Sequence, residues 1–202
     1  MKLYQTLIAV TLIFFSCIPS DVKDQLHQLM NDYHQQALKL YPLNATYQGD
    51  NRYNDYLPNS LSDEFMAKEK KFYSTTLKKL NSLDEVSLGE EDLLSKKVLA
   101  WECDINLKRL EFPIHHLPIN QMWTLQLTIG QLAGGSSAQP FDSIEDYENW
   151  LKRVDDYLVW LNYAEQRMKE GVEKEIVLPK SLIKKVVPQL AYIALTDLED
   201  HL

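Results

Sequence analysis

The sequence is poor in the residues that make tight turns and covalent staples. Only six glycines and eight prolines occur among 202 residues, which disfavours a β-sandwich with many turns and favours long helices. Two cysteines are too few for a scaffold held together by disulfides. A chain of this length needs no staples, because it can bury roughly 70% of its unfolded surface. These shortages favour a mostly helical globular domain.

Basic charge is also scarce. The chain has 21 lysines and arginines against 29 aspartates and glutamates, a formal net charge of −8. Nucleic-acid binding requires a basic surface that neutralises phosphates, so we expect no nucleic-acid partner. An acidic body likewise gains nothing from contact with an anionic membrane.

The N-terminal apolar run is too short to span a bilayer, which takes about 20 residues. It extends from Leu7 to Phe15 (LIAVTLIFF) behind the basic Lys2, as in the apolar core of a secretory signal. The following Ser16-Cys17 resembles the lipobox of bacterial lipoproteins, in which the signal is cut before a cysteine that then carries lipid. The alternative is an ordinary signal peptide, or an uncleaved anchor, that happens to end in cysteine.

We therefore expect a lipoprotein signal peptide over residues 1–16 and a lipid-anchored N-terminus over residues 17–20, attached through Cys17. The protein is then expected to be exported and anchored to a bacterial membrane, on its periplasmic or cell-surface side. Removing the signal deletes one charge, Lys2, so the net charge falls from −8 to −9. Because acylation of Cys17 leaves Cys103 without a partner, no disulfide is expected.

Apolar residues at helical spacing predict about five helices between residues 21 and 195. The expected elements are a helix capped by Ser20 and ending before Pro42, one capped by Ser62 and reaching Leu80, one from Glu90 to about Leu110, one from Ile144 to Glu170 stopped by Gly171, and one from near Pro179 that Pro188 kinks or ends. Between Phe112 and Phe141 the pattern is irregular, and the alternation of Leu125, Leu127 and Ile129 leaves a short strand or a helical turn open. Residues 196–202 are a tail. The predicted fold is mainly α, an irregular array of helices with long loops.

Two of these helices carry conspicuous apolar faces. The third helix has Leu94, Val98, Trp101 and Ile105 on one face. In the longest helix the stripe expected to face the core is Tyr147, Leu151, Val154, Leu158 and Leu161, and beside it lie Trp150, Tyr157 and Trp160. The combined arc is wider than the ~100° stripe that a surface helix needs. Either this helix is central in the bundle, or it packs against something that the chain does not contain.

The segment Tyr41 to Ser60 (YPLNATYQGDNRYNDYLPNS) is expected to be a loop without helical period. It is too rich in tyrosine for a disordered linker. The simpler interpretation is local turn chemistry, with tyrosine rings packed on the flanking helices. If the segment serves a ligand-binding site, the residues expected to form it are Tyr47, Asp50, Arg52 and Asp55.

No catalytic or metal-binding pattern can be assembled from the sequence. There is no H-E-x-x-H motif and no G-x-S-x-G elbow. His27 and His34 are seven residues apart on one helix, about 10.5 Å along its axis and too far to share an ion. His115 and His116 have no third ligand nearby in the sequence. We therefore assign no catalytic residue, no metal ligand and no cofactor to this chain.

Five segments, in order, carry a family resemblance. YPLNATYQGDNRYNDYLPNSL resembles the N-terminal signature of the bacterial domain-of-unknown-function 885 family. The later segments are SLGEEDLLSKKVLAWECDINLKRLEF, LPINQMWTLQL, AQPFDSIEDYENWLKRVDDYL and IVLPKSLIKKVVPQL, and the resemblance covers about Asp21 to Leu190. It implies a large, mostly helical protein that is often exported, often a lipoprotein, and similar to zinc metallopeptidases. The metal motif of that family lies in a C-terminal part, and no residue of this chain matches it.

Two hypotheses about function follow. In the first, the chain is the N-terminal, non-metal-binding part of a metallopeptidase-like hydrolase, an incomplete part of a larger α domain that is inactive alone. Zinc would then belong only to longer relatives, and a missing C-terminal region or a separate chain would be a partner. In the second, the chain is a self-standing, membrane-anchored helical lipoprotein that binds a ligand or partner without catalysis.

Overall fold

The computed structural model describes residues 21–122 and 124–195, and over these ranges the chain is helical without any strand. The mainly α fold predicted from the sequence is confirmed. In chain order the elements are α1 (Val22–Leu40), α2 (Pro42–Tyr47), the 3-10 helix η1 (Asn51–Tyr53), α3 (Asp63–Asn81), α4 (Glu90–Arg109), the 3-10 helix η2 (Ile114–His116), α5 (Leu125–Ala133), α6 (Ile144–Glu173) and α7 (Lys180–Leu195). None of these helices is both long and apolar enough to cross a membrane, within the part of the chain that the structure describes.

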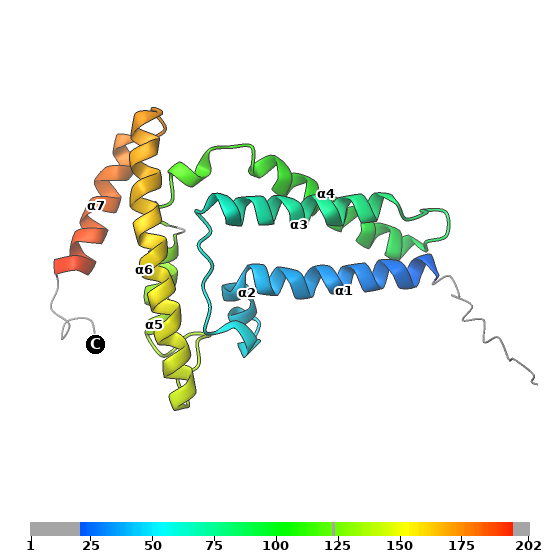
Figure 1. Ribbon diagram of the computed structural model, residues 1–202, viewed down its shortest axis with the longest axis horizontal. Helices are drawn as coiled ribbons and strands as arrows, with labels where there is room; N and C mark the ends of the chain where they lie inside the picture. The colour runs from blue at the N-terminus through cyan, green and yellow to red at the C-terminus, as the bar shows by residue number, and fades with distance from the viewer. Residues whose placement is uncertain (1–20, 123, 196–202) are drawn as a thin grey trace, which may run out of the picture.

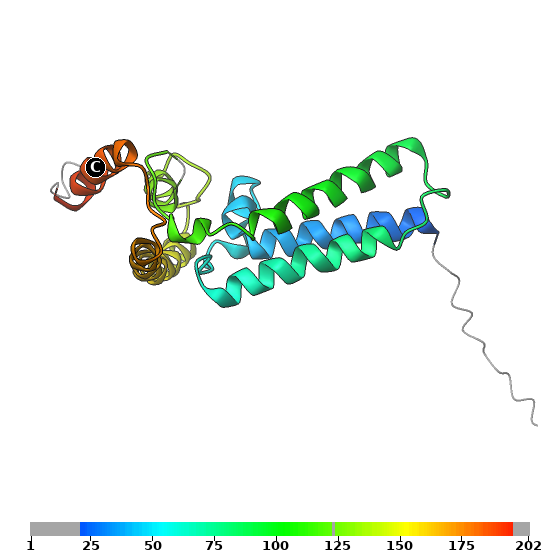
Figure 2. The ribbon, with the colours of Figure 1, turned by 90° about the horizontal axis from the view of Figure 1, so that it is seen from above.

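Helices α1, α3 and α4 lie side by side as an elongated bundle (Figure 1, Figure 2). Each helix contributes two residues to one buried cluster, namely Leu26 and Leu29, Tyr73 and Leu80, and Leu99 and Cys103. The rings of Tyr33 and Phe72 stack beside this cluster with their centroids 4.9 Å apart, which ties α1 to α3.

Helix α6 runs across one end of this bundle, and α5 and α7 lie along it (Figure 1). A second buried cluster joins this layer to the chain that precedes α3. Its members are Leu61, Ile119, Trp160, Ala164 and Val186. The indole Nε1 of Trp160 donates a hydrogen bond to the Ser60 hydroxyl at 3.1 Å, so α6 is held against the segment between η1 and α3.

Local capping explains where two helices begin, as the sequence predicted. The Ser62 hydroxyl accepts a hydrogen bond from the Phe65 N–H at 3.1 Å at the start of α3. At the start of α6, Ser143 and Asp146 form a reciprocal capping box. The predicted cap of the first helix, Ser20, lies outside the described residues.

Several predicted boundaries were wrong. Residues 41–60 are not one irregular loop, because Pro42 occupies the first turn of a short helix, α2, and η1 follows. Residues 125–129 belong to α5, so the strand alternative is excluded. Helix α6 continues past Gly171 to Glu173. Helix α7 continues through Pro188 to Leu195, so of the two alternatives for Pro188 the one in which it ends the helix is excluded.

The apolar face that the sequence singled out on α4 is exposed. Leu94, Val98, Trp101 and Ile105 retain between 44% and 65% of their accessible surface. The buried side of α4 instead carries Lys96, Leu99 and Cys103, because α1 and α3 lie on that side. Lys96 stays satisfied there, since its ammonium donates to the Leu83 carbonyl at 3.1 Å and to Glu85 at 2.8 Å.

The predicted core stripe of α6 is also largely exposed. Tyr147, Leu151 and Leu158 are 56%, 62% and 52% exposed. The buried side is the neighbouring one, with Trp160 and a fully buried Arg153. The width of the apolar arc was thus recognised correctly, but the side that faces the protein was assigned wrongly.

Candidate functional site

The structure brings together only two of the four loop residues predicted to form a binding site. Asp50 caps η1, and its carboxylate receives three hydrogen bonds of 2.6–3.0 Å from the Arg52 guanidinium. Arg52 also donates to Gln35 on α1 at 2.9 Å. Hydrogen bonds from Arg52 lower the pKa of the Asp50 carboxyl. Tyr47 and Asp55 are exposed at other points of the segment. Asp50 and Arg52 therefore form a surface ion pair in η1, and Arg52 connects it to α1.

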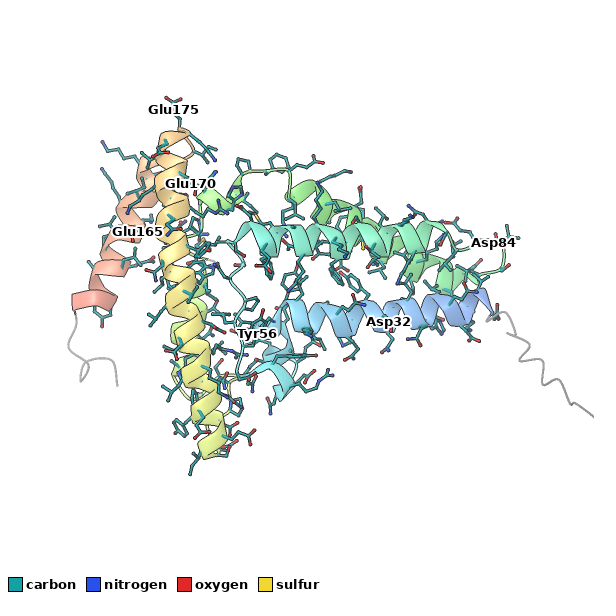
Figure 3. All side chains as sticks on the ribbon, in the orientation of Figure 1. Asp32, Tyr56, Asp84, Glu165, Glu170 and Glu175 are labelled. Carbon is teal, nitrogen blue, oxygen red and sulfur yellow. The ribbon has the colours of Figure 1, made fainter. Side chains whose placement is uncertain are left out.

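The same segment is tied to α6 by a buried polar network that the sequence did not reveal. Its centre is the Arg153 guanidinium, which is fully buried. Arg153 donates to the Tyr53 carbonyl at 2.7 Å, to the Thr46 hydroxyl at 3.1 Å and to Gln139 Oε1 at 2.7 Å. Its Nε also lies 3.4 Å from the Tyr56 carbonyl, and Figure 3 shows Tyr56 at the junction with α6. Arg153 thus holds residues 46–56 against α6 from within the protein.

The charge of Arg153 has no carboxylate in direct contact among the hydrogen bonds described. Burial lowers the pKa of its guanidinium to about 10, and the charges of Asp55 and Asp156 oppose that shift. Asp156 is itself held in place, because its carboxylate accepts the Leu57 N–H at 2.9 Å. The group remains a cation at neutral pH, so the network positions the segment and does not transfer protons.

The largest cavity described has a volume of about 640 Å³ and opens between α1, α3, α4 and η2. Its polar centre is Glu69 on α3, a buried residue. The Tyr41 hydroxyl donates to Glu69 at 2.5 Å, the Arg109 guanidinium pairs with the same oxygen, and the Tyr41 and Tyr73 hydroxyls lie 2.8 Å apart. Since Tyr41 donates its proton to Glu69, its oxygen accepts from Tyr73. Glu69 is therefore the hub of a hydrogen-bond network that joins α3 and α4 to Tyr41, the residue that ends α1.

A second carboxylate lines the same cavity. Glu102 on α4 accepts the Tyr33 hydroxyl at 2.7 Å. Burial, and then the hydrogen bond to Glu102, raises the pKa of Tyr33 well above its ordinary value, and burial with the bond to Glu69 does the same for Tyr41. Both tyrosines therefore stay protonated as donors. The cavity offers carboxylates, phenols and aromatic walls, a composition typical of a ligand pocket.

Cys103 lies near this cavity on α4 but is not among the residues that line it. The side chain is fully buried on the inner side of α4, and burial raises the pKa of its thiol to about 12, so the reactive thiolate does not form near neutral pH. Cys103 is therefore a packing residue of the bundle.

The two adjacent histidines differ in their surroundings. His116 is buried, its Nδ1 lies 3.1 Å from the Arg167 carbonyl, and its Nε2 lies 3.1 Å from the Lys174 ammonium. Because the ammonium can only donate, the Nδ1 position carries the proton and donates to the carbonyl. His115 reaches the rim of the cavity, and burial lowers its pKa. His116 is a packing group between η2 and α6.

Metal-ligating side chains do not cluster in the part of the chain that the structure describes. Within residues 21–122 and 124–195, no group of three His, Cys, Asp or Glu side chains is arranged to hold a metal ion.

The sequence contained one signal for the buried network. Trp150, Arg153, Tyr157 and Trp160 are spaced three, four and three residues apart, so Arg153 lies on the aromatic stripe of α6. An arginine within such a stripe indicates a buried, hydrogen-bonded cation. The hub at Glu69 carried no comparable signal, because Glu69 and Arg109 are 40 residues apart.

Comparison with known proteins identifies the family of this chain. Residues 42–201 match the family described as bacterial protein of unknown function (DUF885). The match covers more than half of the chain, so the chain belongs to this family, and the predicted resemblance is confirmed. No curated protein and no solved structure matches it.

Proposed function

We propose that this chain is the N-terminal, non-metal-binding part of an exported, membrane-anchored hydrolase of the metallopeptidase-like kind. In this proposal it is inactive alone and supplies one wall of a substrate cleft. The single observation that carries the proposal is the uncovered apolar stripe of α6, formed by Tyr147, Leu151 and Leu158. Membership in DUF885 supports the proposal, because the resemblance set out in the sequence analysis implies longer relatives that are similar to zinc metallopeptidases.

The α6 stripe is unusually apolar for a surface that faces solvent. Its three side chains, spaced four and seven residues apart, lie on one side of a helix that a capping box secures. Contiguous exposed apolar patches mark interaction sites more often than free surface. The buried side of α6 already packs in the Trp160 cluster, so α6 has two apolar sides and only one is covered. A further helical part of the assembled protein is the occupant that we propose for the other side.

The cavity around Glu69 is the proposed portion of the substrate cleft. Its tyrosines and carboxylates can bind and orient a polar chain, but no group of three potential metal ligands occurs among the described residues. In the proposal, any zinc is held by a C-terminal region or a separate chain. These residues accordingly contribute binding and positioning to the reaction and no metal chemistry.

The proposal can be tested by complementation. The chain alone, supplied with zinc, should not hydrolyse a mixed peptide library, and it should bind the C-terminal segment of a longer DUF885 relative. Leu151→Glu with Leu158→Glu should weaken that binding by about tenfold or more, because two charges would enter an apolar contact. Lys152→Glu, on an exposed neighbouring position, is the matched control and should leave binding unchanged.

Two results would contradict the proposal. One is zinc-dependent hydrolysis by the chain alone. The other is equal binding of the segment, measured by titration calorimetry, by the unsubstituted chain and by the Leu151→Glu, Leu158→Glu variant.

A self-standing binding lipoprotein is the second candidate, and the cavity favours it. The cavity is lined by residues of α1, α3, α4 and η2, so a ligand bound there contacts several elements of this chain at once. A small polar ligand that raises the melting temperature of the chain alone, and does so less in Glu69→Gln, would favour this candidate.

We further propose that lipid at Cys17 is the anchor; Cys17 lies outside the described residues. Cys17→Ala should release the protein from the membrane fraction, because it removes the acyl chains and an acidic body is not attracted to an anionic membrane surface. Cys103→Ala is the matched control and should stay membrane-bound, since Cys103 is buried in the bundle. Detergent partitioning followed by immunoblotting measures both, and unchanged partitioning of Cys17→Ala would refute the anchor.

A further inference from the structure

The outer side of α4 has the spacing of a helix-pairing seam. Leu94, Val98, Trp101 and Ile105 are separated by four, three and four residues, and each is exposed. A continued alternation of three and four averages 3.5 residues, the repeat that keeps one side of a helix facing another helix. Glu91 and Lys108 continue the same alternation at the two ends. We call these six residues the α4 seam.

We propose that the α4 seam binds the α4 seam of a second copy of this chain, with the two helices antiparallel. The ends of the seam carry opposite charges, Glu91 near the start of α4 and Lys108 near its end. Antiparallel pairing places each Glu91 opposite the second copy's Lys108, whereas parallel pairing places like charges together. The antiparallel arrangement also places the partly positive N-terminus of each α4 beside the partly negative C-terminus of the other, which is favourable.

The apolar centre of the seam is self-complementary in the same register. With Glu91 opposite Lys108, Leu94 meets the second copy's Ile105 and Val98 meets its Trp101. Each layer therefore joins a pair of different side chains, and the large indole packs on the small valine. A parallel register would instead stack Trp101 on Trp101 at the centre.

One flank of the seam gives an independent argument. Lys97 and Asp104 are both on this flank, seven residues or about 10.5 Å apart along the helix, too far to pair within one chain. Antiparallel pairing places this flank of one copy against the same flank of the second copy, so each Lys97 approaches the second copy's Asp104. Asp104 already accepts a hydrogen bond from its own Lys108 at 2.6 Å, so oppositely charged groups alternate at each end of the interface.

This interface is separate from the α6 stripe used in the proposed function. The seam lies along the bundle of α1, α3 and α4, and α6 crosses the end of that bundle (Figure 2). Substitutions on the two surfaces therefore test the two proposals separately.

Disulfide trapping in membranes from cells that produce the full chain tests the pairing and its direction. An equal mixture of Glu91→Cys and Lys108→Cys chains, oxidised with copper phenanthroline, should yield a reducible covalent dimer. Either variant alone should yield at least tenfold less, because like positions lie about 25 Å apart in the antiparallel arrangement and a disulfide needs Cα atoms within about 7 Å. The unsubstituted chain, which retains Cys17 and Cys103, sets the background.

A charge exchange provides the second arm. Lys97→Glu or Asp104→Lys is introduced into both the Glu91→Cys and the Lys108→Cys chains. Each should reduce the yield of disulfide-linked dimer about fivefold, because the two attractive Lys97–Asp104 pairs between the copies become repulsive. Combining both should restore the yield, since the exchanged charges face each other again. Lys78→Glu, at an exposed site of α3, is the matched control for the change in net charge.

The seam itself is tested with Trp101→Glu, which should reduce the yield at least tenfold, whereas Leu151→Glu on α6 should not change it. The proposal is overturned if the mixture gives no dimer above background, or if Glu91→Cys alone gives as much as the mixture. Failure of the combined charge exchange to restore the yield would also overturn it. Circular dichroism confirms that each variant remains folded.

Discussion

Replacing Arg153 with methionine should lower the free energy of unfolding by about 3 kcal/mol or more. The substitution keeps a long side chain but removes every donor from a fully buried position. Gln139 Oε1 and the Tyr53 carbonyl would lose bonds of 2.7 Å inside the protein, where an unsatisfied acceptor costs about 1–3 kcal/mol. Urea denaturation followed by circular dichroism measures the change.

The neighbouring Lys152→Met is the matched control. Lys152 is exposed on the same turn of α6, so its replacement should change the free energy of unfolding by less than about 0.5 kcal/mol. Arg153→Lys keeps the charge but cannot donate in several fixed directions, so it should lose a large part of the stability as well. If Arg153→Met unfolds at the same urea concentration as the unsubstituted chain, Arg153 does not hold residues 46–56 against α6.

The second large effect is expected at Gly171, which the sequence suggested as the end of a helix. A Cβ at this position would lie 2.7 Å from the Ile176 carbonyl oxygen and 3.1 Å from His116 Cβ. Much of the obstruction is backbone, so η2 and residues 174–176 would have to move. Gly171→Ala should therefore lower the free energy of unfolding by about 2 kcal/mol, the middle of the range for overpacked sites.

Gly130 in α5 provides the opposite expectation. Nothing lies within 4 Å of a Cβ built there, so Gly130→Ala should stabilise the protein by up to about 1 kcal/mol through helix propensity alone. Thermal unfolding compares the two variants directly. A Gly171→Ala protein that melts at or above the temperature of Gly130→Ala would show that η2 does not need its close approach to α6.

Local sequence was sufficient to predict several helices because their signals act within a few residues. The Ser62 cap and the Ser143–Asp146 capping box both satisfy backbone donors in the first turn of their own helix. The predictions failed where a distant contact overrode the local signal. Gly171 resembled a helix stop, but α6 continues past it, and a Cβ there would meet both the Ile176 carbonyl and His116 of η2.

The candidate cavity was not predictable from any single segment. Glu69 receives hydrogen bonds from Tyr41 and Arg109, which come from the chain before α3 and from α4. Spacing along the chain carries no information about such pairs, because the folding of the bundle brings them together. The four loop residues predicted for binding remain a prediction, with Asp50 and Arg52 now seen to pair at the surface.

By itself, the sequence determined a mainly α protein of the DUF885 family and the starts of its best-capped helices, because composition and capping are local properties. Only the tertiary structure decided which apolar side of α4 and of α6 is buried. Both helices carry apolar side chains on more than one side, and periodicity treats these sides alike. The choice depends on where α1, α3 and the segment before α3 lie, and those positions leave Trp101 and Leu151 exposed while they bury Cys103 and Arg153.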